Sequence, residues 1–531
     1  MSSIPKIPRI PEDQRTPLVT SLLEIIQLLV ESNQALKDEI AILKGQKPRP
    51  QIKPSKLEKK SEDKELKGGD AKRPGSAKRQ KTRELEIHDT MILRAKNVPD
   101  GSTRKGYEEF TVQGIRFQAH NILYRRERWL TPAGETIIAP LPKDVMCVGG
   151  HFSADLVSYI LAQYHQCHVT QPLILEQLLD LGVDISAGQI SRILTEGKEG
   201  FHAEKDDILR VGLEISDYVH VDDTTARHQG KNGHSTVIGN ELFACYESTL
   251  SKSRRNFLEI MRAGAKDYVL NAAAFDYMSA QQLPHAQMGL LVGCEKRVFE
   301  DFASWKAALD SLGIKSERHI RIATEGALLG SIFAHGSINP NLVILSDDAG
   351  QFDVLLHALC WIHAERSIHK LVGYNEAQRE ALTEVRSQIW DFYAELKSYR
   401  ETPCMWKKLK LLERFDRIFT TRTCYETLNR TLARIHKNKA ELLLVLERPK
   451  IPLHNNAAET DIRELVRKRI ISGSTRSELG RRCRDTFASL KKTCRKLGVS
   501  FWEYLKDRVS GRNSITRLPD LMRQRAGEAP G

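Results

Sequence analysis

The sequence of 531 residues lacks any apolar run long enough to span a bilayer. Its start, Met1 to Arg15, is polar and proline-rich, so we expect no secretory signal peptide. Cysteine is sparse as well: the nine cysteines are odd in number and scattered, and no CxxC pair occurs. This pattern argues against both a four-cysteine zinc site and a disulfide framework. We therefore expect a cytoplasmic protein without a membrane segment.

What the sequence does contain is basic charge and ample length. A chain of 531 residues exceeds a single hydrophobic core, so two to four domains are expected, and a hydrophobic fraction of 40% is enough to fold most of them. The net charge of +13 indicates a polyanionic partner. Charge alone does not separate a nucleic acid from an anionic membrane surface.

Residues 18–44 carry a heptad repeat within an expected coiled-coil domain, 1–44. The d-type positions hold Leu22, Leu29, Leu36 and Leu43, and the a-type positions hold Val19, Ile26, Asn33 and Ile40. β-Branched residues at a, leucine at d and a single buried asparagine favour a parallel two-stranded coiled coil. We therefore predict a homodimer or higher oligomer through this segment, and the alternative is an amphipathic helix that packs on its own domain.

Residues 45–85 are rich in lysine, arginine, proline and glycine, which predicts a basic disordered linker. Its cations fit two roles equally, non-specific phosphate binding or a solubilising tether. Residues 107–140 alternate weakly between apolar and polar, which predicts a small β unit within the domain 86–150. Within that unit, 124–129 mixes aromatic and basic side chains, which suits either DNA contact or a solvated strand edge.

Residues 151–210 are predicted to be helical. Ser153, Thr170 and Ser186 each precede an apolar pattern of helical period, and Gly182 is expected to end the second helix. Two helices joined by a short turn that contains glycine fit a helix-turn-helix, in which Gln189, Ser191 and Arg192 would face the DNA groove. An ordinary helical hairpin is the alternative, and the sequence does not decide between them.

Three acidic residues carry the candidate chemistry. Asp222 ends the run 218–222, Asp347 follows the apolar stretch 342–345, and Glu459 lies one turn into a predicted helix. Two carboxylates at the ends of buried strands and a third on a helix indicate an α/β core of RNase H-like fold. Converging carboxylates repel unless Mg²⁺ or Mn²⁺ neutralises them. Two such ions about 3.5–4 Å apart activate the attacking oxygen and stabilise the leaving oxygen in phosphoryl transfer.

Each acid has a structural alternative. Asp223 and Asp348 are alternative candidates for the roles of their neighbours Asp222 and Asp347. The two-residue period of a strand, however, directs Asp223 to the opposite face of the sheet. If Asn456 caps the helix, Glu459 completes an ordinary capping box. Cys360-Trp361-Ile362-His363 lacks further zinc ligands and is interpreted as packing plus a polar histidine near the cleft.

The segment after Glu459 is basic. Arg463 and Arg467 follow at i+4 and i+8, and Lys468 comes directly after them. We predict that this helix face binds the phosphate backbone of DNA.

Together these motifs resemble the bacterial transposases of the insertion-sequence 66 type, which are DDE enzymes. The resemblance rests on the zipper, Asp222-Asp223-Thr224, Ser346-Asp347 with the 360–363 motif, Asn455-Asn456-Ala457-Ala458-Glu459, and the stretch 467–505. It implies an RNase H-like catalytic domain at 211–510, with Asp222, Asp347 and Glu459 as ligands of two Mg²⁺ or Mn²⁺ ions, and a C-terminal tail at 511–531. It also implies a helical insertion at about 371–448. We place a further insertion, which the family pattern does not imply, at about 255–335. The implied activity is DNA cleavage and strand transfer at the terminal inverted repeats into target DNA, near the nucleoid.

Two departures from the family pattern stand out. Residues 86–146 contain no cysteine, so a metal-free β unit replaces the small zinc finger that the family carries there. The long stretch 252–341 implies an extra insertion before Asp347. Accessory proteins of the same element are expected partners. The competing interpretation is a non-catalytic dimeric DNA-binding regulator derived from a transposase; another RNase H-like nuclease, such as a resolvase or integrase, shares the chemistry but not the motif order.

Overall fold

The computed structural model describes residues 151–336 and 338–528 throughout. Before residue 151 it describes scattered positions between 16 and 33, and then 87–93, 107–108, 110–113, 115, 117–142 and 145. The chain divides into two units, Met1–Phe117 and Gln118–Gly531, and each is described by itself. The predicted linker 45–85 lies outside the described residues, as do the zipper positions beyond Asn33.

In the first unit, the described positions between Leu18 and Asn33 are helical. Leu22, Ile26 and Leu29 of the heptad are exposed there, at 48%, 40% and 63% of their surfaces. A helix is thus confirmed at these positions, whereas its pairing with a second copy stays a prediction. The described residues of 107–117 form neither helix nor strand.

The predicted β unit is represented, in the described part of 118–145, by one short hairpin. Strand β1 (Arg128–Leu130) pairs antiparallel with β2 (Thr136–Ile138). Gly134 has a positive φ of 82° in the turn between them, a conformation that glycine adopts without steric cost. Both strands are exposed along their length.

Three helices follow, as the sequence predicted: α3 (Ala154–His165), α4 (Gln171–Asp180) and α5 (Ala187–Thr195). The side chains of Ser153 and Ser186 accept hydrogen bonds from the first turns of α3 and α5, which confirms both predicted caps. Gly182 has a φ of 80° and follows the end of α4. Each helix contacts the other two, and α6 (Glu199–Ile215) then leads to the central sheet.

The centre of the second unit is a five-stranded mixed sheet. Its strands are β3 (Tyr218–His228), β4 (Lys231–Gly239), β5 (Ala244–Thr249), β8 (Val343–Ser346) and β9 (Leu356–Leu359). The strand order is β5-β4-β3-β8-β9. β4 is antiparallel to both of its neighbours, and β3, β8 and β9 are mutually parallel. The predicted α/β core is confirmed at this level.

The first strand is longer than the sequence indicated. Asp222 was expected at its end, but β3 continues to His228 and turns at Gln229 and Gly230, which both have positive φ. The extension is stable because β4 pairs with β3 from His220 to His228. Asp222 therefore lies inside a strand.

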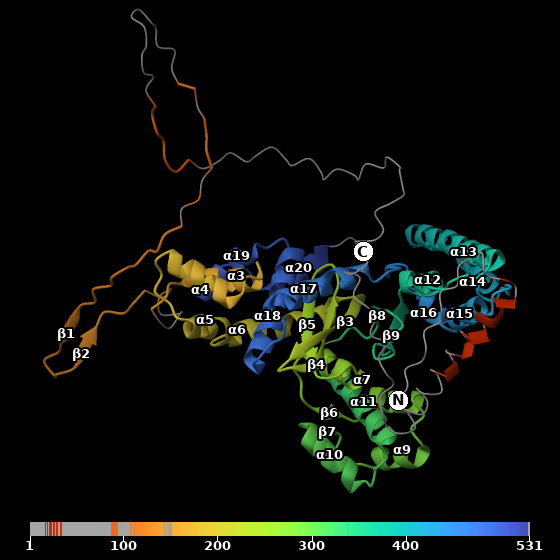
Figure 1. Ribbon diagram of the computed structural model, residues 1–531. Coiled ribbons are helices and arrows are strands. Elements are labelled where there is room, and N and C mark those ends of the chain that lie inside the picture. Colours follow the sequence, from red (N-terminus) through yellow and green to blue (C-terminus); the bar gives the residue numbers. More distant parts are fainter. Residues whose placement is uncertain are drawn as a thin grey trace, which may run out of the picture. The chain divides into compact units, whose positions relative to one another are not determined.

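Helices cover both faces of this sheet (Figure 1). Helices α17 (Asn456–Ser472) and α18 (Glu478–Lys496) pack on β3, β4 and β5. A small core joins Val237 and Tyr246 of the sheet to Ala458, Ile462 and Leu465 of α17. Helices α19 (Phe501–Val509) and α20 (Leu518–Glu528) pack on α3 and α6. The main core lies on the opposite face, where Val219 and Val221 contribute.

Two long segments are inserted into the chain of this α/β core. One lies between two strands of the sheet, and the other lies between the last strand and the helix α17. Between β5 and β8 the chain forms α7 (Arg254–Met261), β6 (Tyr268–Val269), α8 (Ala272–Ala280), α9 (His285–Val292), β7 (Val298–Phe299), α10 (Phe302–Ser311) and α11 (Glu317–Ala334). Between β9 and α17 it forms α12 (Trp361–His369), α13 (Glu376–Glu401), α14 (Met405–Phe419), α15 (Glu426–Lys437), α16 (Lys439–Leu442) and the 3₁₀ turn η3 (Leu444–Leu446). The second segment has its own core around Trp361, Phe392 and Phe415. Among the described residues, no helix combines the length and apolar character that crossing a membrane requires.

Candidate active site

Asp222 and Asp347 lie at matching positions on neighbouring strands. β3 and β8 are parallel, and His220 is the register partner of Leu345. Asp222 and Asp347 each follow those partners by two positions, so both carboxylates belong to the same end and the same face of the sheet. Two residues that are 125 positions apart (347 − 222) in the chain thereby belong to neighbouring strands, whereas the meeting of their side chains at one site stays a prediction.

The face on which Asp222 lies is the one that α17 covers. Asp222 pairs directly with Val237 of β4, and directly paired residues point to the same side of a sheet. Val237 in turn packs against Ala458 and Ile462, the residues that flank Glu459 on α17. The helix that carries the third acid is thus stacked over the strand that carries the first.

Asn455 ties the start of α17 to β3. Its side-chain amide donates a hydrogen bond of 2.8 Å to the carbonyl of Val221, and its Oδ1 lies 2.9 Å from Nδ1 of His220. Its backbone N–H donates to the thiol of Cys360 at 3.2 Å. Asn455 is only 1% exposed. These bonds hold α17 against the strand within one helical turn of Glu459.

Glu459 does not belong to a capping box. α17 begins at Asn456, and its N-cap is Asn455, whose side chain makes no capping bond because it is engaged with β3. The carboxylate of Glu459 instead lies 3.4 Å from Nε2 of His363 and 3.7 Å from the guanidinium of Arg366, both on α12. It is thus held by cationic and polar partners near the sheet, and the capping interpretation is wrong.

The acids share an electrostatic field. Burial, together with the charges of Asp347, Asp223 and Glu459, raises the pKa of Asp222 to about 7, against the lowering effect of the hydrogen bond that its carboxylate accepts from the N–H of Asp223. Burial also raises the pKa of Asp347, while His363 and Lys252 lower it. One oxygen of Asp347 is buried without a hydrogen-bond partner, and the Glu459 oxygen that lies near His363 and Arg366 is also buried and makes no hydrogen bond. Buried carboxylate oxygens without hydrogen bonds and mutually repelling carboxylates are what a cation relieves.

The donor set fits a hard divalent cation in kind, because carboxylate oxygens are the ligands that Mg²⁺ and Mn²⁺ prefer. The described side chains do not form a complete coordination site in this structure. Among the described residues, no three histidine, cysteine, aspartate or glutamate side chains surround a common point at which a metal could be held. The carboxylates share a field and a face, and their side chains stand apart from coordinating geometry.

The two rival aspartates have other partners. Asp223 points to the opposite face, where it pairs with Lys252 at 2.8 Å and accepts a hydrogen bond of 2.8 Å from Gln351. Asp348 accepts one of 3.3 Å from Asn438. The predicted opposite orientation of Asp223 is thus confirmed.

The Cys360-to-His363 motif is a packing and polar element, as expected: Cys360 is buried, and His363 lies beside Glu459. Three neighbours of the site were not singled out from the sequence: Asn455 as a tether, Arg366 beside Glu459, and His220 beneath Asn455. Of these three, only Arg366 could have been found from the sequence. It follows His363 by three positions, which places both side chains on one face of the same helix.

Of the candidate DNA-binding residues, the three arginines are exposed, whereas Lys468 is buried and Gln189 is engaged in a helix cap. Arg463, Arg467 and Arg192 are exposed. Lys468 is only 7% exposed, so the prediction that it shares the face of Arg463 and Arg467 is wrong. It lies nine positions (468 − 459) after Glu459, which at about 100° per residue places it on the far side of the helix. Gln189 accepts a hydrogen bond of 2.8 Å from the N–H of Ser186, so its carbonyl completes a capping box.

The comparisons with known proteins point to a class of proteins that act on nucleic acids, and two carboxylates on neighbouring strands beneath a helix with a third suit that class. The family model described as transposase IS66 family matches residues 347–482, a range that includes Asp347 and Glu459 and begins after Asp222. A protein of Sinorhizobium fredii, named only as uncharacterized protein y4jO, is 46% identical over 304 residues, which are 57% of this chain and 94% of the relative. The chain belongs to the IS66 transposase family and has a transposase-related function.

Proposed function

We propose that the protein is a DDE transposase, which cleaves DNA at the ends of an insertion sequence and joins those ends to target DNA. The observation that carries the proposal is the matched position of Asp222 and Asp347 on parallel strands, beneath the helix that carries Glu459. The strand order, with only the second strand antiparallel, supports an RNase H-like core. Family membership supports DNA as the substrate.

In this proposal Asp222, Asp347 and Glu459 would hold two Mg²⁺ or Mn²⁺ ions. When bound, such ions lower the pKa of an attacking water or align a 3′-hydroxyl and stabilise the leaving oxygen. Arg366 pairs with the charge of Glu459, and the ring of His363, whose pKa burial lowers, lies beside the same carboxylate as a polar neighbour. Because α12 and α17 each supply part of this contact, the position of Glu459 depends on both helices.

The cations around the site would hold DNA. Arg463 and Arg467 are exposed on α17, on the side of the helix that carries Glu459, and suit contact with the phosphate backbone. α4 and α5 would act as a helix-turn-helix in which Arg192 contacts the terminal repeat. Dimerisation through residues 18–44 would let one assembly hold both ends of the element, and accessory proteins of the same element are further partners.

The test is joining of a labelled element end to a target plasmid by the full chain in Mg²⁺ or Mn²⁺. Joined products that depend on the metal support the proposal. The alternative is a non-catalytic dimeric DNA-binding regulator, for which the exposed apolar heptad positions and the exposed arginines would suffice without chemistry. That alternative predicts retention of the DNA in a mobility-shift assay together with no cleavage or joining in either metal.

A further inference from the structure

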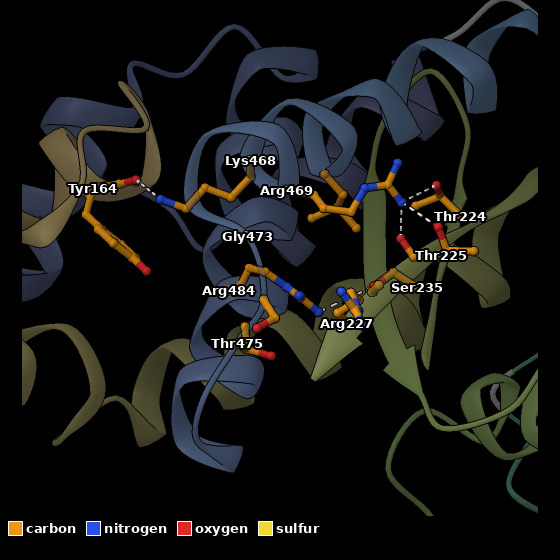
Figure 2. Close-up of a pocket in the computed structure, with 13 residues that line it drawn as sticks. Tyr164, Thr224, Thr225, Arg227, Ser235, Lys468, Arg469, Gly473, Thr475 and Arg484 are labelled. Atoms are coloured by element: carbon orange, nitrogen blue, oxygen red, sulfur yellow. Dashed lines mark hydrogen bonds between the residues drawn. The ribbon is translucent and has the colours of Figure 1, made fainter. Parts of the chain in front are cut away.

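A basic pocket lies between β3, the last turns of α17 and the first turns of α18 (Figure 2). Four cationic side chains line it: Arg227, Lys468, Arg469 and Arg484. Hydroxyl groups of threonine and serine line much of the remainder, and no aspartate or glutamate is among the lining residues. The pocket therefore gathers positive charge and hydrogen-bond donors in one place.

Lys468 is a buried ammonium without an acidic partner. Its Nζ donates a hydrogen bond of 3.2 Å to the carbonyl of Tyr164 and lies 3.6 Å from the centre of that residue's ring. Among the described residues, no carboxylate lies within ion-pair distance of it. Burial, together with the charge of Lys491, lowers the pKa of Lys468 to about 8. A charged group that has lost water without gaining a counterion is costly, and an anion in the pocket would offset that cost.

The arginines of the pocket are only partly neutralised. Arg469 donates to neutral acceptors, the hydroxyls of Thr224 at 3.4 Å and Thr225 at 2.6 Å. Arg227 is exposed and has no ion pair with any described residue. Arg484 pairs with Asp485 at 3.0 Å. The four cations of the pocket thus have one carboxylate partner, Asp485. The remaining positive charge favours a ligand with at least one negative charge.

The position of the pocket identifies the source of that charge. Thr224 and Thr225 follow Asp222 by two and three positions on β3, which is about 7–10 Å along a strand. Lys468 and Arg469 follow Glu459 by nine and ten positions on α17, which is about 14–15 Å along a helix. Phosphates recur about every 3.4 Å of axis on each strand of a duplex. DNA whose scissile phosphate lay at the acids would carry another phosphate to the pocket within about two to four nucleotides.

We propose that this pocket binds a backbone phosphate of the DNA strand held at the candidate active site. The cations supply charge, and the hydroxyls of the lining supply short-range donors. The identity of the DNA as a reacting strand rests on the proposed function, whereas the binding itself does not need catalysis. Because backbone phosphates carry no base identity, the pocket positions the strand and reads no sequence.

The experiment measures the affinity of the full chain for a duplex by fluorescence anisotropy over a range of KCl concentrations, in EDTA. The variants are Arg227→Gln, which changes an exposed side chain, and Lys468→Met, which keeps the aliphatic stem and removes the charge. Lys306→Gln on α10 is the control, an exposed lysine outside the pocket. The plot of log K against log salt is expected to become less steep by about 0.9 in the double variant Arg227→Gln/Lys468→Met. The single variant Lys468→Arg, which keeps the positive charge, should keep most of the wild-type slope. The control variant Lys306→Gln should keep all of it.

An unchanged slope in Arg227→Gln and in the double variant overturns the proposal, whatever the catalytic assays give. A second arm separates DNA from free phosphate by comparing thermal unfolding in sodium phosphate and sodium chloride of equal ionic strength. If the double variant loses stabilisation by phosphate but keeps the DNA slope, the pocket serves a free anion and the assignment to DNA is wrong. A reduced slope in a protein that joins no ends supports the pocket and contradicts only the proposed catalysis.

Discussion

The side-chain amide of Asn455 donates a hydrogen bond of 2.8 Å to the carbonyl of Val221, the residue directly before Asp222. The two partners are 234 positions apart in the chain. This bond joins the start of α17 to the centre of the sheet and fixes the distance between the helix that carries Glu459 and the strand that carries Asp222. The candidate site therefore depends on a residue that offers no charge to the chemistry.

We predict that Asn455→Ala lowers both stability and DNA joining. The substitution leaves the carbonyl of Val221 and the ring of His220 without their partner in a buried setting, at a cost of about 1–3 kcal/mol for each group. Chemical unfolding and the joining assay measure the two effects. Asn232→Ala, at an exposed position of β4, is the control and should change neither. Equal behaviour of the two variants would contradict the tethering role.

The acid cluster gives the metal-free protein a characteristic pH dependence. The pKa of Asp222 is about 7 in the folded protein, against an ordinary value of 3.8, because burial and neighbouring acids disfavour its charge. A raised pKa contributes stability below about pH 4 that is lost as the pH rises to 7. In EDTA the free energy of unfolding should fall by an amount on the order of 2–4 kcal/mol on this account. Asp222→Asn should remove that part of the dependence, and Asp310→Asn, on an exposed part of α10, should preserve it.

Divalent metal should stabilise the protein through the same acids. A ligand that binds only the folded state at 100 times its Kd adds about 2.7 kcal/mol, so Mg²⁺ or Mn²⁺ should raise the unfolding temperature of the wild type. Asp347→Asn should abolish the shift because it removes a charge from the shared field. Asp310→Asn again serves as the control. A shift that persists undiminished in Asp347→Asn would place the bound metal elsewhere.

The two neighbouring aspartates of β3 should differ sharply in their effect on activity. Asp223 faces away from α17 and is paired with Lys252, which itself lowers the pKa of Asp347. We expect Asp223→Asn to reduce DNA joining by about 10- to 100-fold. This is the usual effect of losing a residue that positions a metal-binding side chain without binding the metal itself. Asp222→Asn should reduce it to background. The reverse order of severity would assign the ligand role to Asp223.

The parts of the site that the sequence predicted are those that depend on local pattern. The apolar run 342–345 identifies a buried strand, and the serines before α3 and α5 identify helix starts. In each case the signal lies within a few residues of the feature. The same holds for the opposite orientations of Asp222 and Asp223, which follow from the two-residue period of a strand.

What local pattern missed depends on contacts between distant segments. β3 extends past Asp222 because β4 pairs with it, and Lys468 is buried because Tyr164 of α3 packs on it from 304 positions away. Asn455 reads as a helix start in the sequence, and only the approach of β3 turns its side chain into a tether. Periodicity carries no information about such partners.

The central claim is that Asp222, Asp347 and Glu459 act as one catalytic set. The most direct measurement is joining of a labelled element end to target DNA in Mn²⁺ by Asp222→Asn, Asp347→Asn and Glu459→Gln, with Asp310→Asn as the control and DNA binding measured in parallel. The account predicts that all three substitutions abolish joining while DNA binding and the control's activity persist. Joining at the wild-type rate by any one of the three would contradict it.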